Sequence, residues 1–405
     1  MIEEYFGAID LVCEHINIPV KSGIYPDTLN QILSRNQMQA ARAEIRQWPG
    51  YAPTPLRKFD RLAAELNLGG IYYKDEALRF GLGSFKALGG AYAVLCKIAD
   101  LLSASSGTLV TPADVRSGKH AAAASEITVV SATAGNHGRS VAWGAQQAGC
   151  NCRIYIHSGV DDGRKRALES YGAEVIRVAG DYDDSVPVAA ADADANGWHV
   201  VSDTSYEGYT ECPTNVMAGY SVMGEEALEQ LGEDGPPTHI FAQTGCGGLA
   251  GGVSAQMWAD LDAANPRMIV VEPERAACLA ESARRGKLTG VKIEDESIML
   301  GLSCGDVSVI AWDILAEGAG DYLTIPEAAS PASMRFLASG IAGGEKIVAG
   351  ESAAAGLAAL IGAARRPDLR EALGLNEKSC VMLIGSEGAT APLIYEEIVG
   401  HPPEY

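Results

Sequence analysis

The sequence carries little positive charge. Its 405 residues include 31 lysines and arginines against 52 aspartates and glutamates, so the net charge is −21. Nucleic acids and anionic membranes bind basic surfaces, and we therefore expect neither as a partner. The sequence also lacks an apolar run of ~18 residues, the length that a membrane-spanning helix needs. Its first residues are acidic where a signal peptide would be basic, which predicts a soluble cytoplasmic protein.

The cysteines lack the spacing of zinc ligands. There are nine, and the nearest pair, Cys150 and Cys152, is separated by one residue. Zinc-binding pairs usually have two to four intervening residues, so no metal site is predicted. We expect reduced thiols, as is usual in the cytoplasm.

What the sequence does have is a regular alternation of expected strands and helices. Hydrophobic residues make up 47% of the chain, which is long enough for two domains. Alternation of this kind predicts parallel sheets covered by helices, with a site in the cleft between two α/β lobes, at the carboxyl ends of strands. The expected strands are 71–74, 127–131, 153–157, 174–178, 199–202, 239–243, 268–272, 322–325 and 379–384. Helices are expected at 38–48, 61–66 and 88–102 and near residues 138, 163, 183, 249, 275, 310, 326, 351 and 391, with a surface loop at 103–122.

A short glycine-flanked turn at 83–86 brings Lys86 to the start of an apolar helix. Desolvation in such a place keeps part of the amine neutral, and a neutral lysine amine can form an imine with an aldehyde cofactor. Serine and lysine at this spacing are weak evidence alone, because most lysines are solvated surface charges. Three further glycine-rich loops, each expected at the end of a strand, strengthen the interpretation.

These three loops suit different parts of one small cofactor. Loop 131–138 enters a helix, where backbone N–H groups are free, and its Asn136 is both donor and acceptor. Loop 243–249 places successive glycines before a helix, a nest for an anion such as phosphate. In loop 384–390, Ser386 can bond a ring nitrogen without holding it protonated as firmly as a carboxylate would. Tight turns and close helix–sheet packing are the alternative explanations for the first two loops.

With the four loops in this order, the chain resembles the fold-type II pyridoxal phosphate (PLP) enzymes, the family of threonine dehydratase and tryptophan synthase β. Within that family it is most similar to the diaminopropionate ammonia-lyases. The supporting stretches are 84–92, 135–143, 203–209, 301–305 and 347–352. The resemblance implies a two-lobed α/β fold with a large PLP-binding domain of residues 1–87 plus 207–405 and a small α/β domain of residues 88–206.

The resemblance also implies roles for individual residues. Lys86 would be the Schiff-base lysine, and Asp203 a catalytic carboxylate that receives the distal amine of the substrate, although a cap after the preceding strand explains Asp203 equally well. Cys278 and Cys304 match two family positions that can approach each other, so a disulfide is one outcome and reduced thiols the favoured one. The expected cofactor contacts are Lys86, Phe85, Asn136 at the ring oxygen, Ser386 at the ring nitrogen, and Gly245, Cys246, Gly247, Gly248 and Leu249 at the phosphate. The expected substrate contacts are Ser84, Thr133, Ala134, Gly135, His137, Asp203 and Tyr206.

The expected reaction is an α,β-elimination. Lys86 removes the Cα proton, PLP holds the resulting charge while the β-substituent leaves, and a 2-oxo acid and ammonia result. The implied enzyme is a homodimeric ammonia-lyase acting on an amino acid like L-2,3-diaminopropionate. Three alternatives stay open: a serine or threonine dehydratase, a lyase for another β-substituted L-amino acid, and a non-catalytic protein that binds an amino acid or anion. Family members that consume both enantiomers carry aspartate directly before Gly-Asn-His-Gly, where this chain has Ala134, so L-selectivity is predicted.

Overall fold

Two separate β-sheets run through the computed structural model, which describes residues 1–180 and 182–405. The larger sheet has the strand order β1-β10-β9-β8-β11-β3-β2, and the smaller one β6-β5-β4-β7. Neighbouring strands are parallel except at the two edges of the larger sheet, where β1 and β2 are antiparallel to their neighbours. The strands are β1 (Glu14–Asn17), β2 (Leu56–Lys58), β3 (Gly70–Asp75), β4 (Thr128–Ala132), β5 (Asn151–His157), β6 (Glu174–Val178), β7 (His199–Val200), β8 (His239–Gln243), β9 (Arg267–Pro273), β10 (Ala319–Ile325) and β11 (Cys380–Gly385). The predicted parallel α/β class is confirmed.

Helices connect the parallel strands. The α-helices are α1 (Ile2–Phe6), α2 (Asp27–Asn30), α3 (Arg35–Ile45), α4 (Asp60–Leu66), α5 (Lys86–Ser106), α6 (Pro112–Arg116), α7 (Ala121–Ala124), α8 (Asn136–Ala148), α9 (Asp162–Glu169), α10 (Tyr182–Asn196), α11 (Glu211–Leu231), α12 (Gly248–Leu261), α13 (Cys278–Arg285), α14 (Val309–Gly318), α15 (Ala329–Ala338), α16 (Ala355–Arg365), α17 (Pro367–Leu373) and α18 (Pro392–Val399). Short 3₁₀ turns lie at Arg79–Gly81, Gly232–Asp234, Asp262–Ala264, Glu274–Ala276 and Leu300–Leu302.

The chain divides into two compact units. The large unit comprises Met1–Arg35, Ala52–Phe85 and Met223–Tyr405, and the small unit comprises Asn36–Tyr51 and Lys86–Val222. Residues 36–51 and 207–222 were predicted to belong to the large domain, whereas both segments pack in the small unit. Glycines explain the second case, because a Cβ on Gly89 would lie 2.4 Å from the ring of Tyr220, so α5 and the first half of α11 are in close contact. Residues 36–51 are held in the small unit by Trp48, whose ring meets the edge of the Trp143 ring with ring centres 5.5 Å apart.

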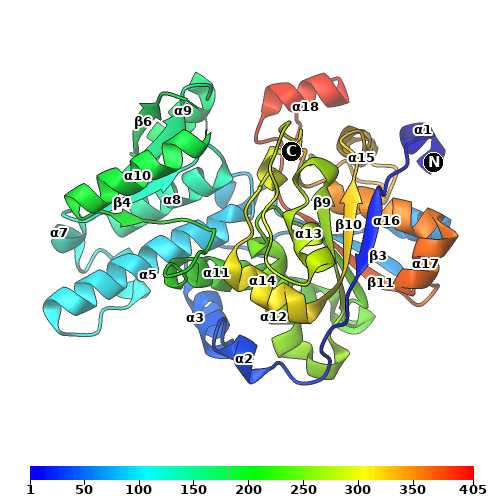
Figure 1. Cartoon of the computed structure of the whole chain (residues 1–405), viewed down its shortest axis with the longest axis horizontal. Helices are drawn as coiled ribbons and strands as arrows, with labels where there is room; N and C mark the ends of the chain where they lie inside the picture. Colours follow the sequence, from blue (N-terminus) through cyan, green and yellow to red (C-terminus); the bar gives the residue numbers. More distant parts are fainter. Residues whose placement is uncertain (181) are drawn as a thin grey trace. The chain divides into compact units, whose positions relative to one another are not determined.

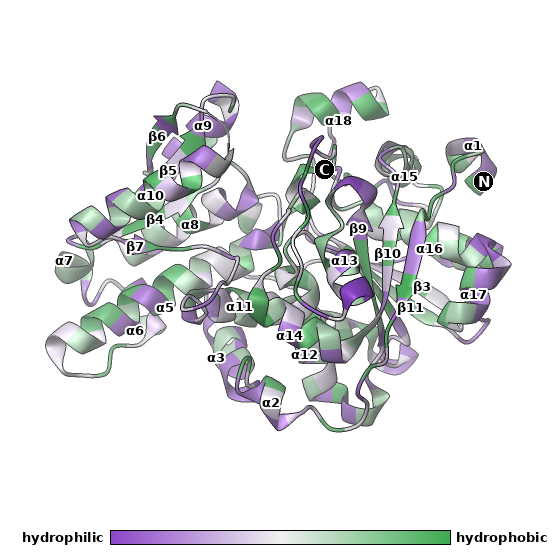
Figure 2. Ribbon diagram, in the orientation of Figure 1, coloured by the Kyte–Doolittle hydropathy of each residue, from purple (hydrophilic) through white to green (hydrophobic). Residues whose placement is uncertain are grey.

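Crossover handedness explains how helices cover both faces of the large sheet. The path β8→β9→β10 moves across the sheet in one direction, and the return to β11 reverses it, so right-handed connections place the later helices on the opposite face. Figure 1 shows α12, α13 and α14 on one side of β9 and β10, and α16 and α17 on the other. All residues of β3, β8 and β10 are buried, as expected of parallel strands covered on both faces. In Figure 2 the outer helix α17 shows purple, hydrophilic residues, whereas α16 is pale to green.

The small sheet follows the same rule. Its path β4→β5→β6 runs in one direction and the return to β7 reverses, so α8 and α9 cover one face and α10 the other. Val130 and Tyr155 of the sheet form a core with Ala189 and Ala193 of α10. Strand β7 ends at Val200 and not at residue 202 as predicted, because the hydroxyl of Tyr209 bonds the Val200 carbonyl and the Ser202 N–H, at 3.0 Å each.

The remaining differences from the sequence-based expectations are several short elements and one long helix, the 21-residue α11. The edge strands β1 and β2 and the helices α11 and α17 were not predicted. The expected surface loop at 103–122 contains α6, which begins at a capping box of Thr111 and Asp114 and has proline at its first position. Such local caps stabilise a single turn without the apolar periodicity that marks longer helices.

Helix α5 is long and apolar enough to cross a membrane by length and composition alone, and 72% of its most apolar window is buried inside the protein. It touches α8 and α11 through Gly90 and Gly89, where added Cβ atoms would collide with Ser140 and Tyr220. Burial of this kind is typical of a core helix.

Candidate active site

The turn before Lys86 is paired with the loop that contains Ser386. The N–H of Gly388 donates to the carbonyl of Gly83 at 2.9 Å, and the N–H of Phe85 donates to the carbonyl of Ser386 at 3.0 Å. Ser84, which is 1% exposed, lies between these bonds and forms an antiparallel β-bridge with Glu387. Two of the four predicted loops therefore form one short antiparallel ladder, and Lys86 is the next residue along the chain.

A buried ionic network fixes the segment between β3 and this turn. The carboxylate of Glu226 accepts from Lys74 Nζ at 2.7 Å and from two nitrogens of Arg79 at 2.8 Å each. Arg79 also donates to both oxygens of Glu76 at 2.7 Å. Two cations and two anions thus neutralise one another where the side chains are at most 1% exposed. Breaking one pair would leave a buried charge without its partner.

In the small unit, Lys86 is ion-paired with Asp203. Lys86 Nζ contacts Asp203 Oδ2 and lies 5.8 Å from the centre of the Tyr220 ring. The hydroxyl of Ser140 donates to the Lys86 carbonyl at 2.6 Å and so ties the start of α5 to α8. This amine was predicted to be desolvated and partly neutral, but its side chain is 20% exposed and faces an anion. A neighbouring carboxylate favours the charged form of an amine.

His137 approaches the same carboxylate oxygen. Its Nδ1 lies 3.8 Å from Asp203 Oδ2, and its Nε2 lies 3.1 Å from the carbonyl of Val201. Burial lowers the pKa of His137, while Asp203 opposes that effect. Burial alone would raise the pKa of Asp203, but His137 and Lys86 together bring it below its ordinary value. The carboxylate is therefore ionised at neutral pH.

The loops that carry these residues follow neighbouring strands. Strand β4 lies between β5 and β7. The connection after β4 leads to β5 on one side, and the later return to β7 places that strand on the other side, so the carboxyl ends of β4 and β7 form a topological switch point. The β4 loop holds Thr133, Ala134 and Gly135, and α8 begins at Asn136. The β7 loop holds Asp203 and Tyr206, whose 56% exposed side chain stacks on Tyr209 with ring centres 5.0 Å apart. Tyr206 was predicted to contact the substrate, and the contact that the structure shows for its ring is with Tyr209.

The large unit has the equivalent switch point between β8 and β11. After β8, Gly247 has a φ of 108°, and a Cβ there would meet the Cβ of Ala311 at 2.9 Å. Gly247 precedes α12 without a side-chain cap, so the first N–H groups of that helix suit an anion. The carbonyl of Cys246 points away to accept from the Ser308 N–H at 2.9 Å. This arrangement fits the predicted phosphate loop, Gly245, Cys246, Gly247, Gly248 and Leu249.

After β11, the hydroxyl of Ser386 is held by Gln243, a residue that the sequence analysis did not single out. Gln243 Nε2 donates to the carbonyl of Ile384 at 2.5 Å and to Ser386 Oγ at 3.1 Å. Since Ser386 Oγ is the acceptor in that bond, its own proton is directed elsewhere. The buried Ser386 is therefore a hydrogen-bond donor, the group that an unprotonated ring nitrogen needs.

The thiols near the phosphate loop are not joined by a disulfide. Cys278 Sγ lies 3.7 Å from the carbonyl of Gly245, and a Cβ on Gly245 would lie 2.8 Å from Cys304 Sγ. All nine cysteines, each within the described part of the chain, are unbridged. Cys278 and Cys304 thus flank the same glycine as reduced thiols.

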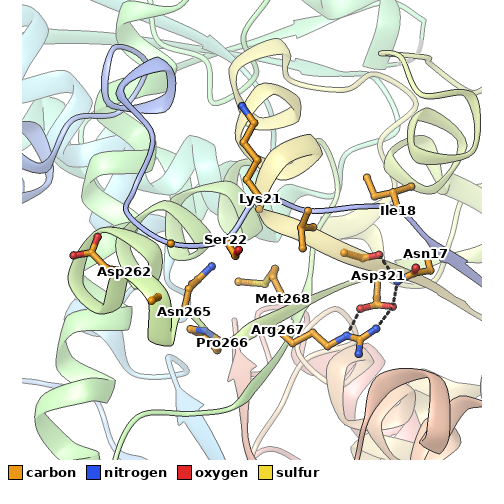
Figure 3. Close-up of a pocket in the computed structure, with 15 residues that line it drawn as sticks. Asn17, Ile18, Lys21, Ser22, Asp262, Asn265, Pro266, Arg267, Met268 and Asp321 are labelled. Carbon is orange, nitrogen blue, oxygen red and sulfur yellow. Dashed lines mark hydrogen bonds and ion pairs between the residues drawn. The ribbon is translucent and has the colours of Figure 1, made fainter.

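A surface cavity of about 310 Å³ lies at the opposite end of the large sheet (Figure 3). It opens at the amino ends of β9 and β10, between Lys21, Arg267 and Asp321. The buried Asp321 carboxylate accepts from His15, Asn17 and Arg267 at 2.6–3.0 Å. These bonds fasten β1 to β10, and the cavity contains none of the predicted site residues.

Comparison with known proteins decides the family. Residues 47–386 match the family described as Pyridoxal-phosphate dependent enzyme. The chain belongs to this family. It is 37% identical over 374 residues to the diaminopropionate ammonia-lyase of Escherichia coli (strain K12), covering 91% of this chain and 92% of that enzyme. The crystal structure of the holo E. coli diaminopropionate ammonia-lyase superposes with a TM-score of 0.86, 34% identity and coverage of 97% and 98%. The crystal structure of the same enzyme in complex with D-serine superposes with a TM-score of 0.85 at 35% identity, covering 96% of this chain and 97% of that one.

PLP fits the residues of this family member. Its phosphate needs N–H donors and room for close approach of the backbone, which Gly247 and the uncapped start of α12 provide. Its ring nitrogen needs a partner, and the buried Ser386 hydroxyl accepts from Gln243 and so keeps its own proton available for a further bond. When bound, PLP acts as an electron sink for the charge left on Cα. The predicted fold type and cofactor are confirmed, and membership of an enzyme family favours catalysis over the alternative of a binding protein.

The structure brings the predicted residues of this PLP enzyme together in two groups. Ser84, Phe85 and Ser386 meet in the large unit, and Lys86, His137 and Asp203 meet in the small unit. Three supporting residues were missed: Gln243, Ser140 and Tyr220. A polar residue ending the apolar run of β8 was a usable signal for Gln243. Nothing local marks Ser140 or Tyr220, because their contacts are to residues far away in the sequence.

Proposed function

We propose that the protein is a PLP-dependent carbon–nitrogen lyase that eliminates ammonia from L-2,3-diaminopropionate or a similar β-substituted L-amino acid. The products are a 2-oxo acid and ammonia. The observation that carries the proposal is Asp203 Oδ2, which faces an ammonium group, that of Lys86. A carboxylate whose pKa is lowered is an ionised acceptor for the distal ammonium group of such a substrate. The name of the E. coli relative supports the same reaction.

Each residue has a stated role in this proposal. Lys86 would hold the cofactor and take the Cα proton of the substrate, and Asp203 would bind the distal ammonium group. Ser386 would face the ring nitrogen of PLP, and a hydroxyl at that place would leave the nitrogen unprotonated, which favours elimination over transamination. The remaining cofactor contacts are Phe85, Asn136, Gly245, Cys246, Gly247, Gly248 and Leu249, and the remaining substrate contacts are Ser84, Thr133, Ala134, Gly135, His137 and Tyr206.

The deciding assay compares three substrates on the purified holoenzyme. Release of 2-oxo acid is measured with L-diaminopropionate, L-serine and L-threonine. The proposal expects the highest kcat/KM with diaminopropionate, whereas a dehydratase would prefer one of the hydroxy amino acids. The protein should be yellow, absorbing outside its own ultraviolet band, and Lys86→Ala should change that spectrum. A colourless protein inactive on all three substrates contradicts the proposal.

We further propose a cytoplasmic homodimer in which the large unit is the PLP-binding domain and the small unit is the small α/β domain. The family resemblance supports the dimer and the two domains, and the net charge of −21 disfavours attachment to an anionic membrane. Sedimentation equilibrium measures the mass directly, and a particle of 42.4 kDa would contradict the dimer.

A further inference from the structure

His137 is a buried ring whose tautomer the structure fixes. Nε2 lies 3.1 Å from the Val201 carbonyl, and since a carbonyl only accepts, Nε2 carries a proton. In the neutral ring, Nδ1 then carries a lone pair and can only accept a hydrogen bond. Within the described residues this buried Nδ1 has no hydrogen-bond partner. An acceptor therefore points into the site without a donor.

The unsatisfied Nδ1 faces the oxygen that holds an ammonium group. Asp203 Oδ2 lies 3.8 Å from Nδ1 and also contacts Lys86 Nζ. The ring cannot turn away easily, because it is anchored to Val201, two residues from Asp203, and α8 is tied to α5 through Ser140. The two acceptors thus keep a fixed separation.

We propose that His137 Nδ1 and Asp203 Oδ2 together form the binding site for the β-ammonium group of the substrate, and that the neutral ring selects an ammonium over a hydroxyl leaving group. An ammonium group offers three donors and can satisfy both acceptors, whereas a serine hydroxyl offers one. A hydroxyl also needs a proton to leave, and two acceptors supply none. This inference rests on the proposed function.

The protonation state of the His137 ring makes the preference for an ammonium over a hydroxyl leaving group depend on pH. Asp203 and Lys86 are the charged groups that face it. Because burial lowers the pKa of His137, the ring is neutral at pH 7 and gains a proton only in more acidic solution. A protonated Nδ1 repels an ammonium group and can donate to a hydroxyl. The preference for diaminopropionate over serine should therefore decline in acid.

Two substitutions separate the roles of the ring nitrogens. His137→Gln can still donate to Val201 but removes the acceptor facing Asp203, and His137→Asn places an amide near Nδ1 that does not titrate. In the holoenzyme, His137→Gln should lower kcat/KM for L-diaminopropionate by about 10- to 100-fold, the loss expected for one hydrogen bond to a charged group, and change L-serine far less. His137→Asn should retain more diaminopropionate activity, and either variant should abolish the acid-side change in preference. Titration of the substrate amines cancels, because each variant is compared with the wild type at every pH. His199→Gln, at the start of β7, is the matched control.

A readout without turnover completes the test. In ¹³C-histidine-labelled holoenzyme, the His137 resonance, assigned by its loss in His137→Gln or His137→Asn, should titrate at lower pH when Asp203 is replaced by asparagine, because the carboxylate raises the pKa of the ring. Equal losses for both substrates, or a titration that ignores Asp203, overturn the inference while diaminopropionate turnover by the wild type upholds the proposed function. Absence of that turnover overturns both. If His137→Gln does not fold, His137→Asn and the wild-type pH profile decide.

Discussion

The two switch points of this protein share a topology and differ in chemistry. Between β8 and β11 the candidate site consists of glycines, free backbone N–H groups and the Ser386 hydroxyl. Between β4 and β7 it consists of charged or titratable side chains, Asp203 and His137, which meet Lys86. The first site suits a cofactor that stays bound, and the second suits the transfer of protons and the binding of charged groups during a reaction. Backbone changes should therefore break the first site, and changes of charge the second.

Charge also has a different use in each unit. The large unit buries Lys74, Arg79, Glu76 and Glu226 completely and uses them to hold the segment before Lys86. In the small unit Lys86 and Asp203 are 20% and 18% exposed, within reach of a ligand. Buried ions of the first kind are evidence of structure, and accessible ions of the second kind are evidence of function.

The largest effect is expected from Lys86→Ala. Activity should fall by much more than the ~10²–10⁴-fold that loss of acid–base catalysis alone would cause, since the covalent attachment of the cofactor is lost as well. Formation of 2-oxo acid from L-diaminopropionate measures this. Lys97→Ala is the matched control, as it removes a lysine of the same helix that pairs with Glu211 at the surface. Near-normal activity of Lys86→Ala would contradict its assignment.

Replacing Glu226 by glutamine tests the structural use of charge. Lys74 and Arg79 lose a buried anion that accepts from both, so the free energy of unfolding should fall by about 3–5 kcal/mol. Urea denaturation gives the value. The control, Glu169→Gln, removes an exposed partner of Lys165 and should change stability by less than about 1 kcal/mol. Equal effects from the two substitutions would show that the network stabilises no more than a surface pair does.

Gly247→Asp should break the backbone-built site. The φ of 108° disfavours any side chain, Ala311 blocks the Cβ, and the carboxylate repels a phosphate. Affinity for PLP should fall about 100-fold or more, as measured by reconstitution of the dialysed protein and its absorbance. Gly286→Asp has the same kind of positive φ, 65°, in open surroundings and serves as the control. Unchanged PLP affinity in Gly247→Asp would make the loop a packing turn.

Local signals made the backbone-built site predictable and left its support unseen. Glycine runs after apolar strands identified the loops at 83–86, 243–249 and 384–390 without any knowledge of distant contacts. The bond from Gln243 to Ser386 and the ladder between Gly83 and Gly388 join residues more than a hundred positions apart. Lys86 likewise meets His137 and Asp203, which lie 51 and 117 positions further along the chain. Alternation predicts that neighbouring strand ends meet, but not which side chains face each other. The short β7 and the early end of its ladder follow from Tyr209, which no periodicity reveals.

The smallest effect concerns Ala134 and the handedness of the substrate. The family resemblance links aspartate at this position with use of both enantiomers, and Lys86, reaching Cα from one side, can take the proton of only one enantiomer. We therefore expect L-diaminopropionate to be consumed much faster than the D-isomer, although the E. coli relative was crystallised with D-serine. Ala134 is partly exposed and lies just before Gly135, the N-cap of α8, where an added carboxylate is favourable beside the helix dipole.

Ala134→Asp should fold and gain a small activity on D-diaminopropionate, because a second base then lies on the other side of Cα, provided that it comes within about 3 Å of the proton. Ala134→Asn is the matched control, with the same shape but no basic group, and should gain none. Initial rates with each pure enantiomer measure the change. Comparable D and L rates in the wild type would contradict the selectivity, and an equal gain in Ala134→Asn would show that shape, and not the carboxylate, is responsible.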